Sequence, residues 1–135
     1  MNTHAFRLHR GDDLLLSIRS YAEKNNLRAA AIVSGVGCVT QAVIRDASGV
    51  NTHQLLGRYE IVSVTGTVSS ARTHLHISLA GEDMRVLGGH LCEGTIVNTT
   101  CEVVLLELPD VVFSKEFDCE TGYNELRITQ TPSDQ

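Results

Sequence analysis

The chain has 135 residues, of which 42% are hydrophobic and only 4% aromatic, so a single domain spanning residues 1–135 with an aliphatic core is expected. A formal charge of −5, with eleven basic residues scattered singly and no Arg-Gly-Arg-Pro hook, argues against a surface that binds a phosphate backbone. With no CxxC spacing among its four cysteines, no signal-peptide pattern and no apolar run of membrane-spanning length, the sequence predicts a soluble cytoplasmic protein with free thiols that does not associate with membranes.

The first predicted elements are a strand and the one convincing helix. Residues 3–10 alternate between apolar and polar side chains, which is typical of a half-buried strand. Asp12 then follows a glycine and is predicted to cap a helix that ends near Asn25. The helix is indicated by an apolar stripe at helical spacing, formed by Leu14, Leu15, Ile18 and Ala22.

Nearly everything after the helix predicts strand. The expected segments are residues 29–33, 39–45, 59–68, 74–79, 85–91 and 95–108, followed by two weaker ones at 111–117 and 125–129. Gly35 and Gly37 indicate a bend or a close backbone approach, residues 46–49 a turn, and Gly66 a bulge. One helix and about seven largely antiparallel strands define an α+β domain. Because one helix covers only part of such a sheet, self-association is the simplest way to cover the rest.

Three of the six histidines fall within seventeen residues, in the segment THLHISLAGEDMRVLGGHL. His74 and His76 are two residues apart on a predicted strand, so their side chains share a face. A return strand brings His90 beside them if the loop holds an odd number of residues, such as 82–84; after an even loop, a bulge at Gly88-Gly89 would be needed. The two interpretations are a metal site and three histidines satisfied on a half-buried sheet.

The chemistry of such a site is only partly specified. Imidazole accepts Zn, Ni, Cu or Fe, so histidines alone do not choose the metal, and zinc is the favoured candidate. Cys92 shares a strand face with His90, but a small buried thiol is the favoured interpretation. A metal with an open coordination position would also be compatible with an enzymatic role. No carboxylate is tied to the histidines by spacing, so catalytic residues are not assigned; the nearest candidates are Glu60, Glu93 and Glu102.

Four motifs along the chain resemble those of one known family. The hexapeptide at 57–62, GRYEIV, begins a predicted strand with a local Arg58–Glu60 pair and resembles the GRFEIL signature of the plants-and-prokaryotes conserved (PPC) domain. Residues 7–14 and 34–37 are similar to the family's strand-to-helix entry and glycine-bearing second strand. Residues 74–91 are similar to its stand-alone bacterial and archaeal members. The resemblance covers about residues 5–108.

This resemblance implies a fold of one helix against an antiparallel sheet, assembled as a homotrimer. It also implies metal ligands at His74, His76 and His90. In plants the domain is joined to AT-hooks and resembles a nuclear module for trimerisation and partner binding, and prokaryotic members are commonly labelled DNA-binding. That label transfers poorly to this sequence, which lacks the AT-hook.

The sequence therefore predicts a homotrimer that binds a divalent metal, with zinc favoured, and that interacts with a small ligand or a protein partner. The alternatives are a metal-dependent enzyme of unknown substrate and a DNA-associated regulator. Direct nucleic-acid binding is not expected, because a trimer would carry three times the negative charge of one chain.

Overall fold

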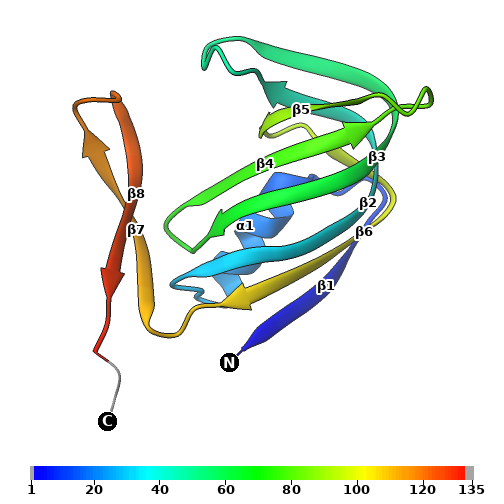
Figure 1. Ribbon diagram of the computed structural model, residues 1–135. Coiled ribbons are helices and arrows are strands. Elements are labelled where there is room, and N and C mark those ends of the chain that lie inside the picture. Colours follow the sequence, from blue (N-terminus) through cyan, green and yellow to red (C-terminus); the bar gives the residue numbers. More distant parts are fainter. Residues whose placement is uncertain (1, 133–135) are drawn as a thin grey trace.

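The computed structural model describes residues 2–132 and has one helix and eight strands in two antiparallel sheets (Figure 1). The elements are β1 (Thr3–His9), α1 (Leu14–Lys24), β2 (Ala30–Arg45), β3 (Thr52–Val68), β4 (Thr73–Ala80), β5 (Val86–Leu91), β6 (Ile96–Glu107), β7 (Val111–Asp118) and β8 (Tyr123–Gln130). The first six strands form one sheet in the order β1-β6-β2-β3-β4-β5, while β7 and β8 pair with each other. The predicted α+β class is confirmed, with eight strands in place of about seven.

β2 is longer than the strands predicted in this region, because it continues through Gly35 and Gly37. The segments predicted separately at 29–33 and 39–45 belong to one continuous strand. A Cβ added to Gly37 would lie 2.1 Å from the carbonyl oxygen of Thr100 on β6, so only glycine permits the two backbones to approach this closely. The predicted close approach is confirmed, but it bends the strand without ending it.

The N-cap of the helix lies one residue later than predicted. Asp13, not Asp12, is the N-cap: it has extended backbone angles, and its carboxylate accepts a hydrogen bond from the Leu16 amide at 3.0 Å. Asp12 instead accepts a hydrogen bond from the backbone N–H of His9 at 2.7 Å, which closes the turn after β1. The prediction failed because both aspartates follow Gly11, and only the tertiary path decides which one faces the free amides of the first helical turn.

The core lies between α1 and one face of the six-stranded sheet (Figure 1). The four predicted apolar residues of α1, namely Leu14, Leu15, Ile18 and Ala22, are all buried. They belong to the same cluster as Leu75, Ile77 and Leu79 of β4. Burial of aliphatic side chains on this scale is the main stabilising contribution in a core with so few aromatic residues.

Two local predictions for β3 were wrong. Gly66 pairs regularly with Leu75, and the irregularity in the β3–β4 register falls between Ile61 and Ser63. Gly66 is required for a different reason, because an added Cβ would lie 2.0 Å from the carbonyl oxygen of His74. Arg58 and Glu60 are both exposed, and no ion pair joins them within residues 2–132.

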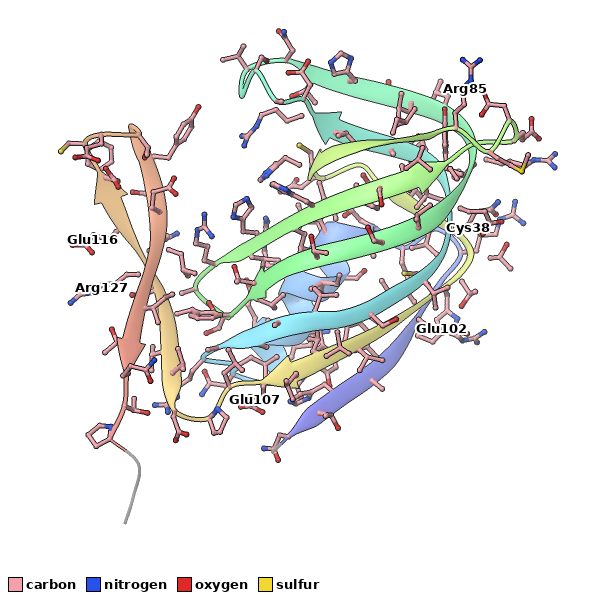
Figure 2. All side chains as sticks on the ribbon, in the orientation of Figure 1. Cys38, Arg85, Glu102, Glu107, Glu116 and Arg127 are labelled. Carbon is pink, nitrogen blue, oxygen red and sulfur yellow. The ribbon has the colours of Figure 1, made fainter. Side chains whose placement is uncertain are left out.

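The β7–β8 hairpin projects from the six-stranded sheet (Figure 1). Its base is attached where the Phe113 N–H donates to the carbonyl of Arg28 at 2.9 Å and the Phe113 side chain is buried. Farther out, the hairpin exposes Phe117, Tyr123 and Ile128. Figure 2 shows Glu116 and Arg127 on its outer side. The Arg127 Nε lies 4.0 Å from the Glu116 Oε2. Among the described residues, no helix is long and apolar enough to cross a membrane.

Candidate metal centre

The β4–β5 hairpin brings the three predicted histidines together. His76 lies directly opposite His90, and residues 81–85 connect the two strands, so the odd-loop condition holds without a bulge. His74 lies two residues before His76 on the same strand, opposite Thr67 of β3. The ring centroids are 5.1 Å apart for His74 and His76, 5.2 Å for His74 and His90, and 5.6 Å for His76 and His90. One ring nitrogen from each histidine lies within 4.8 Å of the other two.

Two glycines fix the position of His90. A Cβ added to Gly88 would lie 2.0 Å from the carbonyl oxygen of Ile77 on β4. One added to Gly89 would lie 2.6 Å from the carbonyl oxygen of Arg45 on β2. Because β5 pairs with β4 on one side and with the end of β2 on the other, side chains at these positions would force the strands apart. The Gly-Gly-His order is therefore a packing requirement that places the third imidazole.

Burial and nearby cations favour the neutral form of the histidines. Burial, followed by the charge of Arg45, lowers the pKa of His90 to about 4. The pKa of His74 is also lowered, by burial first and then by the charge of Arg72. A neutral imidazole keeps the lone pair that binds a metal, whereas an imidazolium has none to offer. The electrostatics therefore keep these two side chains in the form that a metal requires.

His90 also carries an unsatisfied atom. Its Nδ1 is one of four buried side-chain nitrogen or oxygen atoms without a hydrogen-bond partner within residues 2–132. Such atoms are rare in folded proteins, and an ion that the structure does not include is one explanation for them. Three imidazole nitrogens, two of them on half-buried side chains, are a donor set that fits zinc and other divalent transition metals.

The other residues considered from sequence lie outside the cluster. The Cys92 thiol donates toward the carbonyl of His90 at 3.6 Å and does not belong to the group of close donors. Glu93 accepts a hydrogen bond from Arg19 at 3.2 Å, and Glu60 and Glu102 are exposed. Among the described residues, the group of close donors around this centre contains histidines alone.

Three charged residues near the cluster were not identified from sequence. Arg45 lies opposite His90 in the β2–β5 register, and its Nε is buried without a partner. Arg72 and Glu125 have opposite effects on the pKa of His74, the arginine lowering it and the glutamate raising it. Glu125 comes from β8, so the projecting hairpin contributes a negative charge to the surroundings of the histidines. No sequence signal links these residues to the histidines, because their proximity depends on strand register and on the position of the hairpin.

A shallow cavity of about 140 Å³ adjoins the cluster. It is lined by Thr65, Gly66 and Thr67 of β3 together with His74 and His76. Since one water occupies about 30 Å³ in the liquid, the cavity has room for only a few waters or a small ligand group. The two threonine hydroxyls give it hydrogen-bonding capacity beside the histidines.

Comparison with known proteins agrees with this fold. Residues 1–109 match the family model of the Plants and Prokaryotes Conserved (PCC) domain. The bifunctional protein GlmU of Synechococcus sp. (strain JA-2-3B'a(2-13)) is 34% identical over 134 residues, which is 99% of this chain but 21% of that protein. This chain thus spans about a fifth of the length of that relative.

Two solved structures are similar along nearly their whole length. A hypothetical protein from Salmonella cholerae-suis superposes with a TM-score of 0.92 at 34% identity, covering 96% of this chain and 94% of that one. A metal-containing protein from Archaeoglobus fulgidus superposes with a TM-score of 0.80 at 32% identity, covering 94% of both chains. With the family model matching residues 1–109, this chain belongs to the plants-and-prokaryotes conserved domain family.

Proposed function

We propose that this protein binds a divalent metal through His74, His76 and His90. The observation that carries the proposal is the convergence of three imidazole nitrogens within 4.8 Å of one another on the side of β4 and β5 that faces away from the core. Small rotations of the rings would bring all three nitrogens to the 2.0–2.1 Å typical of zinc–nitrogen bonds. The similarity to an archaeal protein described as metal-containing, at 32% identity, supports the same conclusion.

Zinc is the favoured metal, and the site has the character of an open one. Structural zinc sites usually have four protein ligands, whereas three histidines leave a position for a small ligand. A metal in this position supplies Lewis acidity to an oxygen atom bound there. The chain itself would supply the hydroxyls of Thr65 and Thr67 to orient that ligand in the adjoining cavity. Metal-assisted binding of a small ligand is therefore the proposed role, and a metal-dependent enzyme is the second candidate.

A chelator-free preparation analysed for metals by mass spectrometry tests the metal site. The wild-type protein is expected to retain about one divalent ion per chain. His76→Ala removes the most exposed of the three ligands and is expected to lower metal affinity at least about tenfold, which is the scale on which even outer-shell substitutions act. His9→Ala, an exposed histidine at the end of β1, is the matched control and should retain the metal.

Two outcomes would contradict the metal site. One is His76→Ala retaining as much metal as the wild-type protein. The other is wild-type protein that takes up no zinc, nickel, copper, iron or cobalt when each is added in excess. Circular dichroism of the variants ensures that a loss of metal is not caused by unfolding.

We also propose that the protein forms a homotrimer. Exposed valines on β2 and β3, namely Val33, Val36 and Val62, are 60%, 51% and 55% accessible in the isolated chain, and they are candidates for burial between subunits. A permanent assembly would bury more than about 2,000 Å² per interface. Sedimentation equilibrium should give three times the mass of the chain at micromolar concentration, and a stable monomer would contradict the proposal.

Duplex DNA is not the proposed partner. The chain has sixteen carboxylates and eleven basic residues, and an assembly of three chains multiplies the net negative charge. Binding to a random duplex at physiological salt should therefore be weaker than about 10⁻⁶ M, the tight end of ordinary non-specific association. Tighter, salt-sensitive binding would favour the DNA-associated regulator instead.

A further inference from the structure

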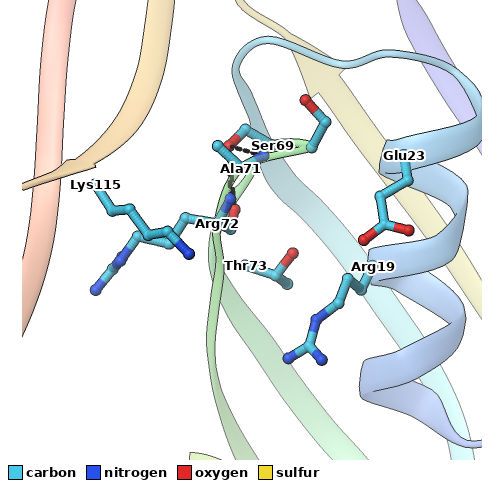
Figure 3. Close-up of a pocket in the computed structure, with 8 residues that line it drawn as sticks. Arg19, Glu23, Ser69, Ala71, Arg72, Thr73 and Lys115 are labelled. Atoms are coloured by element: carbon cyan, nitrogen blue, oxygen red, sulfur yellow. Dashed lines mark hydrogen bonds between the residues drawn. The ribbon is translucent and has the colours of Figure 1, made fainter.

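A second cavity lies at the β3–β4 turn, where residues 69–73 line it together with side chains from α1 and β7. Its volume is about 430 Å³, within the range of small-molecule sites in proteins. We call it the basic pocket, and its lining includes Arg19, Glu23, Ser70, Arg72, Thr73 and Lys115 (Figure 3). No histidine of the candidate metal centre lines it. The basic pocket is therefore a separate candidate site, and it does not depend on a bound metal.

Three cations reach the basic pocket from three different elements. Arg19 belongs to α1, Arg72 to the turn before β4, and Lys115 to β7. In the view of Figure 3, the side chains of Arg72 and Lys115 are on one side of the pocket and Arg19 is on the other. Arg19 donates a hydrogen bond to Glu93 at 3.2 Å, whereas none of the ion pairs within residues 2–132 involves Arg72 or Lys115. Two cations that line one pocket without a carboxylate partner repel each other, and a bound anion would offset that repulsion.

The remaining lining supplies one opposing charge and hydrogen-bonding groups. Glu23 is the only carboxylate among the lining residues, so the pocket has two more positive than negative groups in a chain of net charge −5. Thr73 lies between Arg72 and Arg19 in Figure 3, and its buried hydroxyl has no hydrogen-bond partner among the residues that the structure describes. Ser70 is exposed at the turn and can donate a hydrogen bond to a ligand. Because Arg19 already pairs with Glu93, Arg72 and Lys115 are the cations left for an anion, and two such cations match a dianion better than a single carboxylate.

We propose that the basic pocket binds a small molecule that carries a phosphate monoester. A phosphate monoester has nearly two negative charges at neutral pH and three acceptor oxygens. The guanidinium of Arg72 can bind two of these oxygens in parallel, and Lys115 supplies a point charge beside it. Lys115 lies outside residues 1–109, the part of the chain that matches the family model, so this pocket depends on a hairpin beyond the matched region.

The test is a titration followed through the backbone amide shifts of residues that line the pocket, such as Ser70, at constant ionic strength. The probes are glycerol 3-phosphate, inorganic phosphate and acetate, with chloride as the salt control. The expected result is saturable binding of both phosphates, with acetate binding more weakly. Arg72→Gln and Lys115→Gln are each expected to weaken phosphate binding at least about fivefold, since hydrogen bonds to charged groups make large contributions even when partly exposed.

A matched control separates a built site from general charge attraction. Arg127→Gln removes one positive charge from β8, on the same hairpin as Lys115 but outside the pocket, and should leave the phosphate affinity unchanged. His76→Ala should also leave it unchanged, which distinguishes this pocket from phosphate bound to a metal at the histidines. The proposal is overturned if no probe saturates, if acetate binds more tightly than phosphate, or if Arg127→Gln weakens binding as much as Lys115→Gln.

Discussion

The two faces of β4 differ sharply in their side chains and in their burial. Leu75, Ile77 and Leu79 point into the core and are 1%, 4% and 0% exposed. His74 and His76, which alternate with these residues along the strand, point to the opposite side, where they meet His90. Because side chains alternate along a strand, one stretch of eight residues can serve stability on one face and ligand binding on the other. Substitutions on the two faces should therefore have separable effects.

The separation also has a physical limit. The histidines hold their positions because the strands beneath them are fixed by the apolar core and by glycine contacts between backbones. The core face can be changed without touching the histidines, but the backbone between the faces cannot. Substitutions on the core face, in the backbone between the faces and at a surface turn that belongs to neither face should have effects of decreasing size.

The largest effect is expected from Leu79→Ala, on the core face of β4. Leu79 is fully buried, and truncation of a buried leucine to alanine costs about 2–5 kcal/mol of unfolding free energy. Urea unfolding should show a lower midpoint, while the protein that remains folded still binds one metal ion per chain. His76→Ala should give the opposite pattern, with metal lost and the metal-free unfolding midpoint nearly unchanged. Loss of metal in Leu79→Ala without any loss of stability would break the comparison.

An intermediate effect is expected from Gly88→Ala, which alters the backbone between the faces. The added Cβ would collide with the Ile77 carbonyl oxygen at 2.0 Å, and overpacking of this kind costs about 1–3 kcal/mol. Because His90 is two residues away on β5, metal affinity should fall together with stability. Gly81→Ala, in the connection between the strands, is the control, since its nearest contacts would be 3.4 Å away. A Gly88→Ala protein with wild-type metal affinity would show that the strand spacing does not position His90.

Local periodicity accounts for the parts of this structure that could be predicted from sequence. The apolar stripe from Leu14 to Ala22 marks the helix, because its 3.6-residue spacing depends on nothing outside the segment. Strand parity placed His76 opposite His90 only on the condition of an odd connection, and the structure has one at residues 81–85. The plants-and-prokaryotes resemblance of four ordered motifs added the family and the overall architecture, which the match to residues 1–109 confirms.

Features that depend on tertiary contacts were missed. The choice of Asp13 over Asp12 as the cap is set by the path of the chain after β1. The effects of Arg45 and Glu125 on the histidines depend on a strand register and on a hairpin far away in sequence. Gly66 was predicted to form a bulge, and this prediction was wrong. A lone glycine in a strand is compatible with either a bulge or a close backbone approach, and the sequence does not distinguish the two.

The smallest effect is expected at the turn between β2 and β3, which belongs to neither face of β4. Hydrogen bonds from Ser48, and then from His53, lower the pKa of the Asp46 carboxyl from its ordinary value of 3.8 to about 2. A folded-state pKa below the unfolded value means that the carboxylate stabilises the fold above about pH 4, and that this contribution disappears as the pH falls toward 2.

Ser48→Ala removes the largest cause of the shift and should move the Asp46 pKa, measured by carbon-detected NMR titration, upward toward 3.8. Because the Asp46 side chain is 39% accessible and is screened by solvent, the unfolding midpoint at neutral pH should change less than in Leu79→Ala or Gly88→Ala, and metal binding should not change at all. A loss of metal in Ser48→Ala would mean that this turn is coupled to the histidines, and the two faces of β4 would then not be the boundary between stability and binding.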